Sequence, residues 1–173
     1  NSLSLIGKKV LISAGPTIEE LDPVRFISNH SSGKMGFALA ETALSLGAEV
    51  KLISGPTDQI ISSNKINLVK IKTGAQMQKA IMDDYHESDI VIMAAAVCDY
   101  KPKEISKKKI KKDNKEINIK LEKTTDILME LGKTKKNQFL VGFALENEDE
   151  ISNAKNKLKK KNLDLIVLNS LND

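Results

Sequence analysis

The sequence predicts an α/β fold, a single Rossmann-like domain whose mostly parallel sheet is covered by helices on both faces. Short apolar runs rich in β-branched residues alternate with longer segments of helical periodicity, which is the order expected of repeated strand–helix–strand units. The length of 173 residues suits one domain. Because neither an internal repeat nor a long linker divides the chain, we expect one domain over residues 1–173.

Six segments are expected to be strands. Each is a short aliphatic run that ends beside glycine, proline or a polar residue. The run at 89–97 is the most apolar and is expected near the centre of the sheet. In chain order the six are KKVLISAG (8–15), AEVKLISG (48–55), INLVKIKT (66–73), DIVIMAAAV (89–97), QFLVGFALE (138–146) and LDLIVLNS (163–170).

Four segments are expected to be helices. The first is preceded by Ser32, a residue type suited to the N-cap, and is expected to end at Gly47. The second has apolar residues at helical spacing, namely Met77, Ile81, Met82 and Tyr85. The four segments are GKMGFALAETALSLGAE (33–49), GAQMQKAIMDDYHES (74–88), DILMELGK (126–133) and EISNAKNKLKKKN (150–162).

Two segments fit neither pattern. Residues 16–32 form an unusually long connection after the first strand, and residues 98–126 form an exposed insert. The insert contains a basic run from Lys107 to Lys112, which predicts a mobile loop, and then EINIKLEK (116–123), which predicts a hairpin strand.

Composition excludes several classes of protein. The net charge is +4, but aromatic residues make up only 3% of the chain and tryptophan is absent, so platforms for stacking nucleic-acid bases are scarce. No apolar run approaches the roughly 18 residues of a membrane span, and the first residues lack the pattern of a secretory signal. The single Cys98 suits a reducing compartment. We therefore expect a cytoplasmic protein that binds neither nucleic acid nor membrane.

The stretch ISNHSSGKMG (27–36) resembles a phosphate loop but fails its pattern. A P-loop needs a glycine five positions before the Gly-Lys pair and a hydroxyl residue after it, whereas this chain has Ser28 and Met35 there. A weaker interpretation stays open, because a helix N-terminus presents amides that favour an anion. The alternative is a capped helix without a ligand.

Other catalytic patterns are absent from the sequence. GPTIEE stands where a dinucleotide-binding protein would have its glycine fingerprint. His30, His86 and Cys98 are isolated, so they form neither a metal cluster nor a triad. A site of lysines, amides and small residues without a nucleophile suits phosphoryl or nucleotidyl transfer, in which the protein positions substrates and neutralises charge.

Some residues at the ends of expected strands stand out individually. Asp99 can accept hydrogen bonds from a sugar or a base. The alanines at 94–96 permit close approach of a planar base, although packing of a central strand explains them equally well. The Lys107–Lys112 run fits either a phosphate clamp or a solvated loop. Arg25 is the only arginine in a lysine-rich chain, which hints that a planar donor is needed there.

Several motifs together resemble the bacterial phosphopantothenoylcysteine synthetase family, also called phosphopantothenate–cysteine ligases. They follow in the family's order over essentially the whole chain. They are SAGPTIEELDPVRFISNHSSGKMGFALA (13–40), AAAVCDY (94–100), KIKK (109–112), VGFALE (141–146) and KNLDLIVLN (161–169). The family usually continues beyond a stretch such as LNSLND (168–173), so a C-terminal tail is expected to be missing.

The resemblance implies a two-step ligation in coenzyme A biosynthesis. The co-substrate is CTP with Mg²⁺, and the substrates are 4'-phosphopantothenate and L-cysteine. An acyl-cytidylate forms with release of pyrophosphate, and cysteine then displaces CMP. The family also implies a homodimer and, in many bacteria, fusion to a flavin-dependent decarboxylase.

The resemblance assigns roles to individual residues, and the protein ligands of the metal stay unassigned. Asn29 should contact the acyl-cytidylate carbonyl, and Arg25 should orient that segment or the anionic substrate. Lys109 matches a mobile lysine that meets the triphosphate. The remaining positions match contacts to the nucleotide and its phosphates: Ser31, Ser32, Gly33, Ala94, Ala95, Ala96, Asp99, Asp126, Ile127, Phe143, Lys157 and Lys161. At Thr125 the family usually has proline.

Three alternatives stay open from the sequence. One is a Rossmann-like NADPH-dependent reductase, which the missing glycine fingerprint disfavours. Another is a non-catalytic module that binds nucleotides or nucleic acid. The third keeps the ligase reaction but uses ATP in place of CTP.

Overall fold

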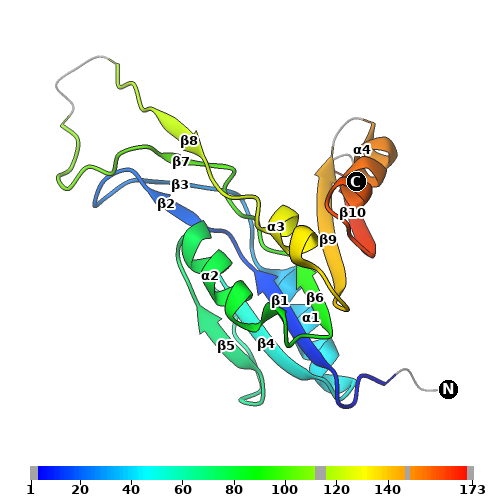
Figure 1. Cartoon of the computed structure of the whole chain (residues 1–173). Helices are drawn as coiled ribbons and strands as arrows, with labels where there is room; N and C mark the ends of the chain where they lie inside the picture. Colours follow the sequence, from blue (N-terminus) through cyan, green and yellow to red (C-terminus); the bar gives the residue numbers. More distant parts are fainter. Residues whose placement is uncertain (1–3, 112–115, 147–148, 171–173) are drawn as a thin grey trace.

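The computed structural model describes residues 4–111, 116–146 and 149–170. Six strands form one sheet in the order β10-β9-β6-β1-β4-β5 (Figure 1), and every neighbouring pair is parallel. This confirms the predicted sheet and the central position of β6. The strands are β1 (Lys9–Ala14), β4 (Glu49–Ser54), β5 (Asn67–Lys70), β6 (Ile90–Met93), β9 (Phe139–Glu146) and β10 (Leu165–Ser170).

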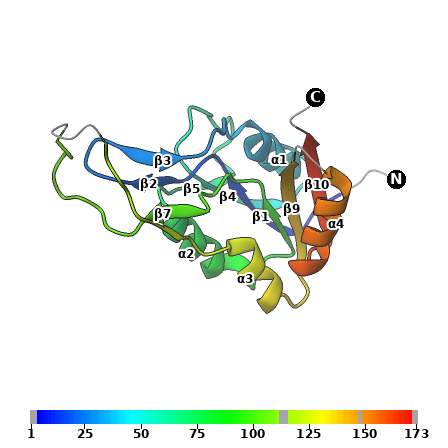
Figure 2. The ribbon, with the colours of Figure 1, turned by 90° about the horizontal axis from the view of Figure 1, so that it is seen from above.

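Helices cover both faces of the sheet, as predicted. On one face α1 (Lys34–Ser45) packs against β1 and β4. On the other face lie α2 (Gly74–Tyr85), α3 (Ile127–Thr134) and α4 (Glu150–Lys160), as Figures 1 and 2 show. Alternate side chains of β1 enter the two cores, so that Ile12 packs with α1 while Leu11 packs with α2 and α3.

The start of α1 differs from the sequence-based prediction. Ser32 was expected to be the N-cap, but that prediction is wrong: Gly33 occupies the position with φ 75°, and no side chain caps the helix. Thr57 Oγ1 donates to the Ser32 carbonyl (2.7 Å) and thereby fixes the residue that precedes the N-cap. The left-handed conformation that follows favours glycine. The predicted end at Gly47 is confirmed, with φ 92° and its N–H bonded to Leu44.

The two irregular segments build an extension, which we define as the described parts of residues 18–28 and 100–123. The long connection contains an antiparallel pair, β2 (Ile18–Glu20) and β3 (Phe26–Ser28), where the sequence suggested only a loop. The predicted hairpin strand in the insert is confirmed as β8 (Leu121–Lys123), paired antiparallel with β7 (Tyr100–Pro102). Figure 1 shows both pairs extending away from the ends of β1 and β6.

Candidate functional site at the switch point

The sheet reverses its strand order between β1 and β6. From β1 the chain adds β4 and β5 on one side, and it then adds β6, β9 and β10 on the other. Loops diverge at such a point and leave a crevice beyond the carboxyl ends of the strands. Here the loop after β1 and the loop after β6 are joined by two hydrogen bonds before they separate. The Ala96 N–H donates to Gly15 O (2.9 Å), and the Thr17 N–H donates to Ala96 O (3.2 Å).

A cavity of about 150 Å³ lies beside this point, between the loop after β6, the start of α3, β9 and the end of α4. Small-molecule pockets usually hold roughly 300 Å³ or more, so the cavity is too small to enclose a whole nucleotide. Seven residues predicted for the nucleotide site line it: Ala95, Asp99, Asp126, Ile127, Phe143, Lys157 and Lys161. They come from distant parts of the chain, and only the fold brings them together.

The charged groups of this cavity are anchored. Asp126 is the N-cap of α3 and accepts the Met129 N–H at 3.0 Å. It also pairs with Lys161 at 2.7 Å. Burial acts to raise the pKa of Asp126, but Lys161 and the Met129 amide outweigh it and hold the pKa below its ordinary value. Lys157 Nζ donates to the Phe143 carbonyl at 2.6 Å. Two lysine head groups thus stand at one cavity, a suitable arrangement for an anion.

The three alanines after β6 are held by the end of β1 and the residue that follows it. The Ala94 N–H donates to Ser13 O, and the Ala95 N–H donates to Ser13 Oγ, both at 3.2 Å. Ser13 is buried, and sequence analysis missed it because it stands inside a strand. Since these amides are already bonded, the alanines contribute small side chains and space.

Asn29 reaches the same point from β3. Its Nδ2 donates to the Val97 carbonyl at 3.1 Å, and Val97 lines the cavity. The next turn is held by two threonines that sequence analysis also missed: Thr17 Oγ1 accepts the Cys98 N–H (2.9 Å), and Thr124 Oγ1 donates to Cys98 O (2.5 Å). In the sequence, the only sign of Thr17 and Thr124 is that each is a hydroxyl residue in a segment expected to be a loop.

Cys98 is buried beneath this turn. Burial raises the pKa of its thiol. A protonated, inaccessible thiol is a poor nucleophile, so Cys98 is poorly suited to attack a substrate.

The other predicted residues lie outside this cavity. Ser32 and Gly33 stand beside Thr57, in the loop after β4, and Ser31 Oγ accepts the Gly33 N–H at 3.4 Å. Arg25 and Lys109 lie in the extension, where Arg25 Nη2 donates to the Ile110 carbonyl at 2.9 Å. The structure does not place Lys109 at the lysine pair, and Lys112 of the KIKK motif lies outside the described residues.

The described residues offer neither a cluster of metal ligands nor a helix that could span a membrane. Within residues 4–111, 116–146 and 149–170, no group of three or more His, Cys, Asp and Glu side chains is arranged to hold a metal ion. In the same ranges, each helix is too short or too polar to cross a bilayer.

Fold and cavity define a Rossmann-like α/β protein with a polar site at its switch point. Comparison with known families is more specific: residues 5–173 match the family described as DNA/pantothenate metabolism flavoprotein C-terminal domain, and the chain belongs to this family. The predicted resemblance is thereby confirmed at the level of family.

Individual proteins are similar to this chain over nearly its whole length. The chain is 56% identical over 170 residues to a cysteine/cysteine sulfinic acid decarboxylase from an unknown prokaryotic organism, covering 98% of this chain and 47% of the relative. It is 49% identical over 170 residues to the coenzyme A biosynthesis bifunctional protein CoaBC of Bacillus subtilis strain 168, covering 98% and 42%. The chain thus spans less than half of these curated relatives.

Solved structures share the architecture. The crystal structure of the C-terminal domain of CoaBC is 45% identical, with a TM-score of 0.87, covering 97% of this chain and 80% of that one. A mutant of Cab2 in complex with phosphopantothenate-cysteine shares the fold, with a TM-score of 0.80 at 22% identity, covering 95% and 73%.

Proposed function

We propose that residues 1–173 act as one ligase domain that joins 4'-phosphopantothenate to L-cysteine with CTP. The observation that carries this proposal is the cavity where Asp99, Asp126, Lys157 and Lys161 meet from three separate segments. Its two lysines suit the phosphates of a nucleotide, and its carboxylates suit a sugar or a base. The relation to the C-terminal domain of CoaBC supports a role in coenzyme A biosynthesis.

The chemistry needs no protein nucleophile. A carboxylate oxygen of 4'-phosphopantothenate attacks the α-phosphorus of CTP, the α–β anhydride bond breaks, and pyrophosphate leaves. The amine of cysteine then attacks the acyl carbon and loses a proton, and CMP leaves. Mg²⁺ on the triphosphate would neutralise further charge, held by phosphate oxygens and water.

The protein's own groups then have distinct tasks. Lys157 and Lys161 neutralise phosphate charge at the cavity, and the amides near Ser31, Ser32 and Gly33, outside it, meet a phosphate that extends beyond it. Asn29, already fixed on Val97 O, directs its amide toward the acyl carbonyl. Lys109 approaches the triphosphate from the extension and stabilises charge that develops during activation.

Of two rival functions, the reductase is less well supported and the ATP-dependent ligase is separated only by experiment. A dinucleotide fold passes from its first strand through a glycine turn directly into a helix, whereas here β1 leads into the β2–β3 pair. A ligase that uses ATP has the same residues available, so nucleotide choice is decided by experiment.

The test is to incubate the protein with 4'-phosphopantothenate, Mg²⁺ and either CTP or ATP, and to measure pyrophosphate before and after cysteine is added. We expect release with CTP, followed by CMP and phosphopantothenoylcysteine once cysteine is present. Turnover of NADPH, or nucleotide binding without pyrophosphate release, would contradict the proposal.

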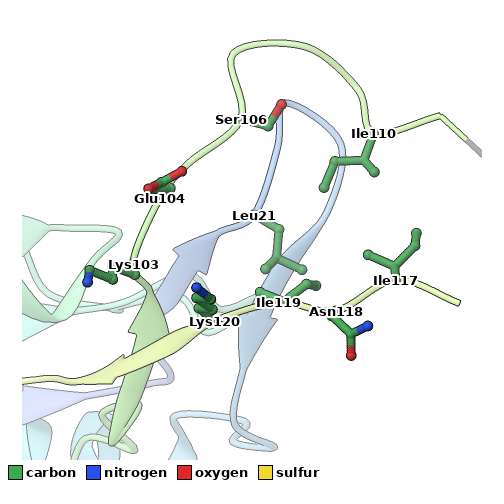
Figure 3. A pocket seen from close by; sticks show the side chains of 9 residues that line it. All are labelled: Leu21, Lys103, Glu104, Ser106, Ile110, Ile117, Asn118, Ile119 and Lys120. Atoms are coloured by element: carbon green, nitrogen blue, oxygen red, sulfur yellow. The ribbon is translucent and has the colours of Figure 1, made fainter.

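We further propose that the protein forms a homodimer through the extension. Seven large apolar side chains of the extension are 43–60% exposed: Val24, Phe26, Tyr100, Ile105, Ile117, Ile119 and Leu121. Beside them a hollow of about 400 Å³ is lined by Leu21, Ile110, Ile117 and Ile119, among others (Figure 3). Apolar surface gathered in this way marks an interaction site, and a second copy supplies a matching apolar face.

We also propose that the protein is cytoplasmic and that it is fused to, or cooperates with, a second enzyme. The unpaired Cys98 suits the cytoplasm. The bifunctional and decarboxylase names of relatives more than twice as long support fusion to, or cooperation with, a flavin-dependent decarboxylase.

A further inference from the structure

The turn between β2 and β3 holds the segment that contains Lys109. We call residues 106–111 the lysine segment. The Ser106 N–H donates to Leu21 O (3.0 Å), and the Ile110 N–H donates to Asp22 Oδ2 (3.1 Å). Figure 3 shows the chain from Lys103 to Ile110 arching past Leu21. The lysine segment is therefore attached near both ends, although the sequence predicted a mobile loop.

Asp22 is the centre of this attachment. It is only 1% exposed, and its Oδ1 accepts the N–H groups of Val24 and Arg25, each at 2.8 Å. Arg25 Nε lies 3.8 Å from Oδ2. Burial acts to raise the pKa of Asp22, but the amides of Val24, Ile110 and Arg25 and the guanidinium of Arg25 together hold the pKa below its ordinary value. Asp22 therefore stays ionised.

Asp22 and Arg25 grip both backbone polar groups of one residue. Asp22 accepts the N–H of Ile110, and Arg25 Nη2 donates to its carbonyl at 2.9 Å. Ile110 directly follows Lys109, so this grip sets the direction in which the chain presents the lysine. A lysine has no planar fork with which to reach Ile110 O and lie beside Asp22 together, which accounts for the single arginine of the chain.

We infer that Asp22 is a positioning residue for the ligation: with Arg25 it fixes the backbone at Ile110 and thereby orients Lys109 for activation of the substrate. This inference rests on the proposed function. Asp22 acts through the lysine segment and needs no contact with substrate. Sequence analysis assigned it no role.

The first experiment measures amide hydrogen exchange at Ile110 by NMR in Asp22→Asn. The side-chain amide of asparagine has one acceptor oxygen, whereas the carboxylate of Asp22 has two. Either the Ile110 N–H or the N–H groups of Val24 and Arg25 therefore lose their acceptor. Since a hydrogen bond to a charged group is worth roughly 1.5–3 kcal/mol, exchange at Ile110 should be about 10- to 100-fold faster, with exchange at β1 and β6 unchanged. Arg25→Lys, which leaves the carboxylate in place, should loosen Ile110 in the same way. Slow exchange at Ile110 in both variants would overturn the inference.

The second experiment measures single-turnover pyrophosphate release. Asp22→Asn should slow it about tenfold or more, whereas Asp22→Asn combined with Lys109→Gln should be no slower than Lys109→Gln alone, because residues that act as a unit are non-additive. Multiplied losses would contradict a shared role. Glu20→Gln on β2, which removes an exposed ion pair with Lys72, should stay within twofold. If the wild-type protein releases no pyrophosphate, the proposed function fails, while the exchange experiment still decides whether Asp22 holds the segment.

Discussion

Asn29 can be substituted with little effect on the fold, so its role in the reaction can be tested separately. Its side chain is exposed, and Nδ2 donates to Val97 O. Asn29→Asp replaces that donor by an acceptor. We expect pyrophosphate release to change only a few-fold and amide formation to slow about 100-fold, the usual effect of removing an oxyanion donor. Rapid-quench assays of both half-reactions test this, with exposed Asn64→Asp as control. Equal loss in both steps would contradict the assignment.

Lys109 is predicted to act in the other half-reaction. Lys109→Gln keeps a polar side chain, one bond shorter, but removes the charge, so pyrophosphate release should fall about 10- to 100-fold. Lys108→Gln, at the neighbouring exposed lysine, is the matched control. Normal release in Lys109→Gln would remove this residue from the chemistry.

The lowered pKa of Asp164 should make the free energy of unfolding depend on pH. Burial acts to raise its pKa, but the Leu140 amide (2.7 Å) and Lys135 (3.0 Å) hold the pKa below the ordinary value of 3.8. A carboxyl whose pKa is lower in the folded state stabilises the protein above pH 3.8, and this contribution disappears as the pH falls through the folded pKa. Urea unfolding should therefore show a smaller acid-induced loss of stability in Asp164→Asn. An unchanged pH dependence would show that other groups dominate.

At the scale of elements, α3 and α4 meet too closely for a side chain at Gly132. A Cβ there would lie 1.9 Å from Lys161 O, and Asn162 Nδ2 donates to Gly132 O at 3.1 Å. The same two elements supply Asp126 and Lys161 to the cavity. Packing of one glycine therefore sets the distance across the candidate site.

Gly132→Ala should consequently destabilise the protein. Alanine usually favours a helix by about 1 kcal/mol over glycine, but overpacking costs about 1–3 kcal/mol and wins here. CTP affinity should fall as well. Urea unfolding and calorimetry measure the two effects, and exposed Lys133→Ala on the same helix is the control. A gain in stability would show that α4 moves aside freely.

At the scale of the whole molecule, the extension should join two copies. Phe26→Lys places a charge in the proposed interface and should weaken the dimer by roughly 2 kcal/mol or more. Analytical ultracentrifugation measures the change, and circular dichroism checks that the fold persists. Ile60→Lys, at an exposed isoleucine outside the extension, should leave the dimer intact. A wild-type monomer would refute the proposal.

Local patterns in the sequence determined the elements and much of the candidate site. The six strand segments and four helices lie where the apolar runs and helical spacing predicted them. Motif resemblance placed Asp99, Asp126, Phe143, Lys157 and Lys161 in one site, and the structure brings these five together. The elements were predicted correctly because the period of buried residues can be read along the chain, whereas the roles of these five residues stay predictions.

Tertiary structure decided what depends on contacts between distant segments. Gly33 replaced Ser32 as the N-cap because Thr57 holds the preceding carbonyl. Asp22 acquired its partner at Ile110, 88 residues away, and Gly132 acquired its constraint from the end of α4. A hydrogen bond or a close approach of this kind exists only after the chain has folded, so the spacing of residues along the sequence carries no sign of it.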